Sequence, residues 1–123
     1  MDRELVSDLV RDALVSYCYD ATPPGSTKGV PWSAERVKSN IERLKVALVV
    51  PYLESFELRE SYEQVSQKQK SYAEFWVVAK IGSYLEWYDP GTGEFGLGQR
   101  LEGSLIPVSI GVRGDLVRVF CAI

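Results

Sequence analysis

The pattern of apolar and polar residues predicts two amphipathic helices in the first half of the chain. Apolar residues recur every three or four positions within residues 2–19 and again within 34–48, a spacing that places them on one face of a helix. The first stripe comprises Leu5, Val6, Leu9, Val10, Ala13, Leu14 and Cys18, and the second comprises Val37, Ile41, Leu44 and Leu48. Each helix therefore has one face suited to cover a sheet.

Helix boundaries are marked by capping and breaking residues. Ser33 is a predicted N-cap, and Trp32 before it can pack on Val37 across the cap. Pro51 disfavours helical geometry at the residue before it, so the second helix should end between Ala47 and Val49. The segment 20–32 holds three prolines and two glycines, which predicts an irregular loop between the two helices.

From residue 54 onward the apolar period changes to two, as in strands with one buried face. Strands are expected at 54–65, 72–81, 84–88, 94–98, 104–110 and 116–122. Gly82 and Ser83 predict a hairpin turn, with a bulge inside one long strand as the alternative. The segment Asp89-Pro90-Gly91-Thr92-Gly93 predicts a chain reversal, and Arg113-Gly114-Asp115 is expected to be the turn of a last hairpin.

This order of elements predicts the fold class. The chain of 123 residues, 46% of them hydrophobic, has the size of one domain that can bury a core without disulfides or metals. We expect a single α+β domain over residues 1–123, with two N-terminal helices packed on one face of a five- or six-stranded, largely antiparallel, meandering sheet. In the long strand 72–81, the predicted core face is formed by Ala73, Phe75, Val77, Ala79 and Ile81, with Tyr72, Glu74, Trp76, Val78 and Lys80 on the other face.

Composition excludes several kinds of chemistry. The chain has no histidine, which excludes Ser-His and Cys-His nucleophile pairs and histidine-ligated metals. Its two cysteines, Cys18 and Cys121, are far apart in sequence and are expected to be reduced and buried. A disulfide between them is the alternative if the first helix ends beside the last strand. A formal net charge of −3 disfavours nucleic acid as a partner. Without a membrane-spanning run or a signal-peptide pattern, we expect a cytoplasmic protein.

Two glycine-rich segments resemble nucleotide-binding loops only in composition. Residues 25–29, GSTKG, do not have the order of a phosphate-binding loop and follow a predicted helix instead of a strand. Residues 91–96, GTGEFG, match GxGxxG but precede no predicted helix, which a dinucleotide site requires. No cofactor or metal is expected.

Glu60 is the one candidate catalytic residue. It falls on the apolar phase of its predicted strand, between Leu58 and Tyr62, so a regular strand would point its carboxylate into the core or a cavity. A desolvated carboxylate of this kind can act as a general acid or base. A bulge, an edge position or an ion pair are the alternatives.

Two functions fit these residues. The first is a non-enzymatic interaction module that binds a protein partner or self-associates through exposed rings of the second sheet face, namely Tyr72, Trp76, Tyr84 and Tyr88, because Tyr and Trp are favoured interface residues. The alternative is a small-molecule pocket between the helices and the sheet, with Glu60 as its polar group. Such a pocket would also suit a simple enzyme that uses Glu60 as its acid or base. That pocket would be lined by Trp76, Trp87, Tyr84 and Tyr62.

Overall fold

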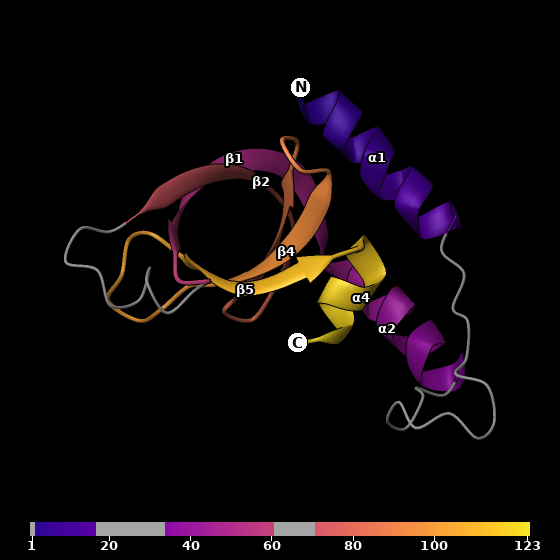
Figure 1. The fold of residues 1–123 in the computed structure, drawn as a ribbon. Helices are drawn as coiled ribbons and strands as arrows, with labels where there is room; N and C mark the ends of the chain where they lie inside the picture. The colour runs from indigo at the N-terminus through magenta and orange to yellow at the C-terminus, as the bar shows by residue number, and fades with distance from the viewer. Residues whose placement is uncertain (1, 17–33, 61–70) are drawn as a thin grey trace, which may run out of the picture.

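In the part of the chain that the structure describes, five strands that follow one another in sequence close into a barrel, and three helices lie outside it (Figure 1). The computed structural model describes residues 2–16, 34–60 and 71–123. The helices are α1 (Arg3–Ser16), α2 (Ala34–Ala47) and α4 (Leu116–Cys121). The strands are β1 (Leu48–Leu58), β2 (Tyr72–Ile81), β3 (Tyr84–Asp89), β4 (Glu94–Gln99) and β5 (Val108–Gly114).

The barrel is an antiparallel meander that closes through one short parallel contact. Neighbouring strands from β1 to β5 pair antiparallel. The ring is completed where Glu57 and Leu58 of β1 pair in parallel with Val108 and Ser109 of β5. The prediction of an α+β fold with an antiparallel, meandering sheet is confirmed. Its closure was not predicted, because strand spacing carries no information on whether the first and last strands meet.

Two hydrophobic clusters lie on opposite sides of the barrel wall. The inner core, inside the barrel, consists of Phe56, Phe75, Val77, Leu85 and Trp87. The outer core lies between the barrel wall and helices α1, α2 and α4. Its residues include Tyr88 and Phe95 from the barrel, and Val6, Leu44, Val119 and Phe120 from the helices. Strand β3 contributes to both, since Leu85 and Trp87 belong to the inner core and Tyr88 to the outer core. Both faces of β3 are therefore buried along most of its length.

Helix α2 ends at Ala47, inside the predicted interval, but β1 begins immediately afterwards at Leu48. The prediction that this strand starts at residue 54 was therefore wrong. Pro51 lies within β1, and its carbonyl accepts a hydrogen bond of 2.9 Å from Arg3 Nε of α1. Proline is tolerated here because it removes only a donor from the strand.

Both predicted reversals of the central region are confirmed. Ile81 pairs with Tyr84, so Gly82 and Ser83 form the two-residue hairpin turn between β2 and β3. Gly82 has φ 58°, the left-handed geometry that such turns require. At the next turn, Gly93 has φ 74° and its amide donates to the carbonyl of Asp89 at 2.8 Å.

The predicted two-face division of β2 holds only for its first half. Phe75 and Val77 belong to the inner core as expected, but Val78, predicted on the opposite and wetter face, is buried in the outer core. The pairing of β2 with β3 shifts between Val77 and Ala79, which is the effect of a β-bulge. Both faces are buried there because the outer core covers the far side of the strand.

The prediction of a strand at 116–122 was wrong, because Leu116–Cys121 is helix α4. Asp115 has extended geometry, φ −80° and ψ 161°, and its side chain accepts from the amide of Arg118 at 2.9 Å. This is an N-cap, which stabilises the start of a helix. The residues Leu116, Val117, Val119, Phe120 and Cys121 are buried, so the apolar pattern fits either a strand or a helix enclosed on most sides.

The last strand was also placed too early in the sequence. The prediction of a strand at 104–110 overlaps β5 only from Val108, and β5 continues to Gly114. Arg113 and Gly114 therefore lie within a strand, and Asp115 starts α4 directly after it. The expected turn and final hairpin do not form.

Several sequence predictions fall outside the described residues. These are the Ser33 cap with Trp32, the loop at 20–32, the end of the first predicted strand with Tyr62, and Cys18. Cys121 is a buried free cysteine.

Candidate functional site

Two of the predicted binding residues, Tyr72 and Trp76, lie on the outer face of β1 and β2, where apolar side chains are exposed. Three cross-strand pairs point outward there: Leu53 with Trp76, Ser55 with Glu74, and Glu57 with Tyr72. They alternate with inner-core residues such as Phe56 and Phe75, so their side chains face away from the barrel interior. We call Leu53, Ser55, Tyr72, Glu74 and Trp76 the β1–β2 outer face.

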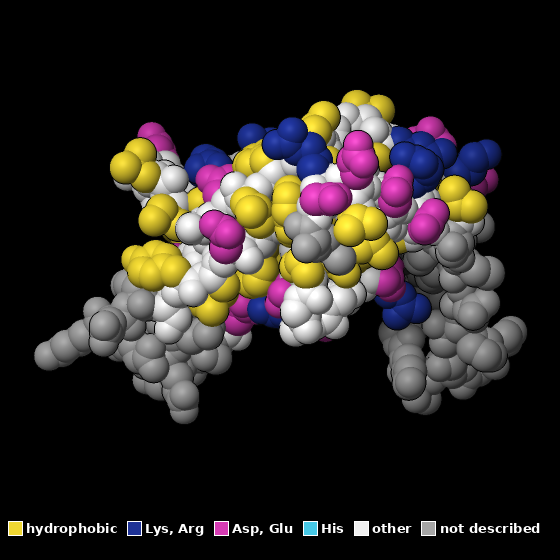
Figure 2. Space-filling view, turned by 90° about the horizontal axis from the view of Figure 1, so that it is seen from above, with side chains coloured by type: hydrophobic (Ala, Val, Ile, Leu, Met, Phe, Trp, Pro, Cys, Tyr) yellow, Lys and Arg dark blue, Asp and Glu magenta, His cyan; other side chains and the backbone are white. Residues whose placement is uncertain are grey.

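Apolar side chains on this face remain partly uncovered. Leu53 is 48% exposed and Tyr72 is 55% exposed, whereas Trp76 is half-buried. Figure 2, which views the molecule from above, shows hydrophobic side chains emerging between acidic and basic ones. Isolated exposed apolar residues are ordinary. This face differs because Leu53 lies directly opposite Trp76, and Tyr72 lies on the same face of β2 four positions before Trp76.

The outer face continues a row of residues that the outer core covers. Trp76 pairs with Tyr88 of β3, and Tyr88 pairs with Phe95 of β4. The rings of Tyr88 and Phe95 lie 4.9 Å apart with a tilt of 48°. Both are buried against residues of α4, so the row Leu53–Trp76–Tyr88–Phe95 runs from exposed surface into the protein.

The charge on this face is acidic. Glu74 is exposed, and no ion pair joins it to another residue in the part of the chain that the structure describes. Glu57 is buried and forms an ion pair with Arg59. The free carboxylate of Glu74 therefore sets the local charge.

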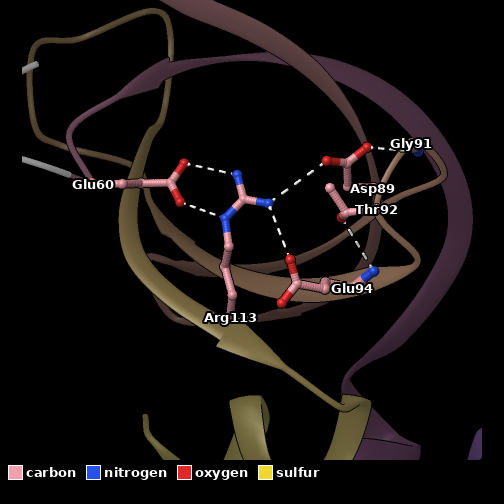
Figure 3. Close-up of polar contacts among 6 residues, drawn as sticks. All are labelled: Glu60, Asp89, Gly91, Thr92, Glu94 and Arg113. Carbon is pink, nitrogen blue, oxygen red and sulfur yellow. Dashed lines mark hydrogen bonds and ion pairs between the residues drawn. The ribbon is translucent and has the colours of Figure 1, made fainter.

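A second polar cluster lies at one end of the barrel, around Arg113 (Figure 3). Arg113 Nε donates to Glu60 Oε1 at 2.6 Å, and Nη2 donates to Glu60 Oε2 at 3.1 Å. Its Nη1 lies 3.6 Å from Asp89 Oδ2 and 3.7 Å from Glu94 Oε1. Three carboxylates from separate chain segments thus surround one cation.

The turn between β3 and β4 holds two of these carboxylates in place. Asp89 Oδ1 accepts from the amide of Gly91 at 2.9 Å, and the amide of Glu94 donates to Thr92 Oγ1 at 3.3 Å (Figure 3). Hydrogen bonds from Arg113 to Glu60, together with the nearby Asp89 and Glu94, raise the pKa of the guanidinium. Arg113 is therefore a permanent cation that ties strand ends together.

Glu60 is the predicted catalytic candidate, and the structure gives it the geometry of the ion-pair alternative. Both carboxylate oxygens accept from Arg113. A general base must be free to take a proton from substrate, so catalysis by Glu60 would require Arg113 to move away. No arrangement around Glu60 in the described residues supplies the predicted pocket.

The barrel interior is filled by rings that glycines accommodate. Trp87 stacks on Phe75 with centroids 4.0 Å apart and an angle of 13°. A Cβ at Gly96 would overlap the Trp87 indole, and one at Gly98 would lie 2.7 Å from Phe56 Cε1. Bulky residues at either position would collide with the core. The inner core is therefore a packed interior.

The predicted aromatic residues are distributed over different parts of the molecule. Trp87 is fully buried in the inner core, whereas Trp76 and Tyr84 pack against the outer core. They do not line one pocket together. The expectation that Tyr88 is exposed was wrong, because it is only 7% exposed and lies in the outer core. Of the predicted interface rings, Tyr72 is exposed, and Trp76 and Tyr84 are half-buried.

A groove does exist between a helix and the barrel, and none of these aromatic residues belongs to its lining. It has a volume of about 610 Å³ and lies between α2 and the β2–β3 turn. Its apolar lining comes from Val46, Ala47 and Ile81, and its charged lining from Glu42, Arg43 and Lys80.

Two polar residues in important positions had no distinctive sequence signal. Arg113 falls in a predicted turn, although its alternation with Val112 would also fit a strand. Glu86 has no signal in the sequence, yet it is 1% exposed and neither carboxylate oxygen has a hydrogen-bond partner among the described residues. Burial, followed by the proximity of Asp115, raises the pKa of Glu86 well above its ordinary value.

Comparisons with protein-family models, with curated proteins and with solved structures find no match for this chain. Over residues 2–16, 34–60 and 71–123, no group of three or more His, Cys, Asp or Glu side chains could hold a metal ion. Within the same residues, no helix has both the length and the apolar character needed to cross a bilayer. The expectations of a cytoplasmic location and of no nucleic-acid partner stay predictions.

Proposed function

We propose that this protein is a non-enzymatic binding module that docks a protein partner on the β1–β2 outer face. The observation that carries this proposal is the accessibility of three apolar side chains on one face: Leu53, about half exposed, pairs with the half-buried Trp76, and Tyr72, also about half exposed, lies four positions before Trp76 on β2. Tyr and Trp combine a large apolar surface with few rotatable bonds, which makes them favourable contact residues. A barrel wall fixes their positions before binding, which reduces the entropic cost of association.

Charge favours a partner segment in which a basic residue accompanies apolar ones. Glu74 lies between Tyr72 and Trp76 on the same face and is exposed without an ion-pair partner among the described residues. A Lys or Arg of the partner would find its counter-charge there, while apolar side chains would contact Leu53 and Trp76. Complementary charge of this kind contributes to specificity and association rate.

Selection of peptides tests this proposal. Random peptides displayed on phage are selected on the parent protein, and the affinity of the selected peptides is then measured for variants. We expect enrichment of Lys or Arg next to apolar residues, loss of binding to L53S/Y72S, and weaker binding to E74K. The matched control is Val15→Ser in α1, because this valine is highly exposed but lies on a helix outside the β1–β2 outer face.

Two outcomes would contradict the docking of a foreign segment on this face. Peptides that bind L53S/Y72S as well as the parent would place the binding surface elsewhere. A concentration-dependent mass in analytical ultracentrifugation, abolished by L53S/Y72S, would instead identify a second copy of the chain as the occupant.

The groove between α2 and the β2–β3 turn supports a second candidate function, the binding of a small molecule. Its volume of about 610 Å³ is within the usual range of ligand sites, and it combines apolar with charged lining. A thermal-shift screen with metabolites tests it: compounds that stabilise the parent should no longer stabilise Val46→Trp, whose indole would occupy the groove. Equal stabilisation of both proteins would exclude this site.

A further inference from the structure

Glu86 occupies the outer wall of the barrel beneath the helices. It pairs with Ala79 of β2 and Leu97 of β4, and both neighbours belong to the outer core. In the sheet its side chain points away from the inner-core residues Leu85 and Trp87 on either side of it. The carboxyl is therefore enclosed between the strands and the helices that cover them.

Among the described residues, the charged group that acts on the pKa of Glu86 is Asp115, which has the same sign. From α4, Asp115 at the N-cap and the thiol of Cys121 interact with it. From α2, Asn40 donates to Cys121 Sγ at 3.4 Å, and Arg36 influences Cys121. Strands β2 and β4 contribute apolar neighbours, and α1 contributes Val6 and Val10 to the same cluster. Asp115 would repel an ionised Glu86.

Burial of an ionised carboxylate without hydrogen bonds is strongly unfavourable, so such a group either takes up a proton or regains water. Glu86 can regain water only if the helices that cover it move. We propose that docking of α4, and with it α2, onto the barrel is coupled to protonation of Glu86, so that ionisation of this carboxyl loosens the helices from β3 and β4.

The direction of the pH effect follows from proton binding. Between the ordinary pKa of glutamate, about 4.3, and the raised pKa of Glu86, the folded state holds a proton that the unfolded state has lost. Stability from this group is therefore complete below the ordinary value and is lost as the pH rises through the raised one. The folding equilibrium constant should fall by up to about tenfold per pH unit in that window.

The first experiment measures urea unfolding of the parent and of Glu86→Gln as a function of pH. Gln imitates the protonated acid in shape and cannot ionise, so the loss of stability with rising pH should be absent from this variant. Glu74→Gln, an exposed carboxylate on the same barrel, is the matched control and should follow the parent. An equal pH dependence in the parent and Glu86→Gln would overturn the proposal.

The second experiment tests whether α2 and α4 are the elements that loosen when Glu86 ionises. Hydrogen exchange of peptides that cover α2 and α4 is compared between the parent and Glu86→Gln at the same pH, so that intrinsic exchange rates cancel. The parent should exchange faster than the variant in both helices at high pH, while peptides from β1 and β2 should change less. A difference spread uniformly over all peptides would refute a local effect on the helices.

If Glu86→Gln fails to fold because its buried amide lacks a hydrogen-bond partner, Glu86→Met serves as the second variant. Methionine has similar length and no polar group to satisfy, and it should also remove the pH dependence. If neither variant folds, the proposal is wrong, because Glu86 would then make a necessary polar contact.

Discussion

The guanidinium carbon of Arg113 lies 4.8 Å from the centre of the Trp87 ring, so the cation rests on the inner core. The same guanidinium donates two hydrogen bonds to Glu60. Arg113 therefore connects the packed barrel interior to the end of β1, to the β3–β4 turn and to β5. Its position explains why a partly exposed arginine should matter for stability.

Replacement of Arg113 by Met should destabilise the protein by about 2 kcal/mol, because it removes the ion pair with Glu60 and the cation from the Trp87 ring. Chemical denaturation measures the loss. The double variant R113M/E60Q should recover part of it. The control Arg11→Met breaks the exposed pair with Asp8 and should cost less than about 1 kcal/mol. Equal losses for the two arginines would contradict the assigned role.

Gly96→Ala should cost about 3 kcal/mol, because the added methyl group overlaps the Trp87 indole and overpacks the inner core. Trp87→Phe makes room, so the loss in G96A/W87F should be smaller than the sum of the two single losses. Gly82→Ala is the contrasting variant: its Cβ meets open space but φ is 58°, so about 1 kcal/mol of backbone strain is expected. Additive losses at Gly96 and Trp87 would indicate that the ring does not fill this site.

Tryptophan fluorescence should separate the two faces of the barrel wall. In W32F/W76F the remaining Trp87 should emit at short wavelength and resist quenching by acrylamide, because it is fully buried. In W32F/W87F the remaining Trp76 should be quenched more strongly. Equal quenching of both proteins would contradict the assignment of Trp76 to the accessible β1–β2 outer face.

Asp115→Ala should destabilise the protein by about 1 kcal/mol, the usual cost of removing an N-cap side chain. Asp115→Asn should keep most of that stability, because its side-chain oxygen can still accept from the Arg118 amide. Thermal unfolding of the two variants and the parent compares them. If Asn were as costly as Ala, the contribution would come from the charge instead of the cap.

Glu86→Met should leave stability unchanged or increase it by about 1–3 kcal/mol near neutral pH, because an apolar side chain replaces a buried carboxyl without hydrogen bonds. Urea unfolding at pH 7 measures it. A loss of stability comparable to that of Gly96→Ala would mean that Glu86 has a polar partner.

Helices α1 and α2, the two central turns and strands β2 to β4 were predictable because their signals are local. Apolar periodicity identified α1 and α2, and glycine-containing turns located both hairpins. Residues 116–121 were misread because a short segment with one exposed position, Arg118, satisfies strand alternation as well as a buried helix. The decisive signal was the cap: Asp115 after Gly114 favours a helix start, and it was read instead as part of a turn.

The tertiary relationships were less predictable because they depend on barrel closure. Glu60 and Arg113 are 53 positions apart, and nothing near either residue indicates that they meet. The ion pair was one of the alternatives for Glu60, but its partner was not identified. Similarly, the exposure of Tyr72 followed from the strand phase, whereas the burial of Tyr88 depends on where the helices lie.

Because the chain is synthesised from its N-terminus, the residues of the inner core are complete before those of the outer core. All inner-core residues lie between Phe56 and Trp87, so the ring stack can begin to assemble as soon as the first three strands leave the ribosome. The outer core must wait for Val119 and Phe120. Until α4 emerges, Tyr88 and Phe95 lack the α4 side chains that complete this cluster.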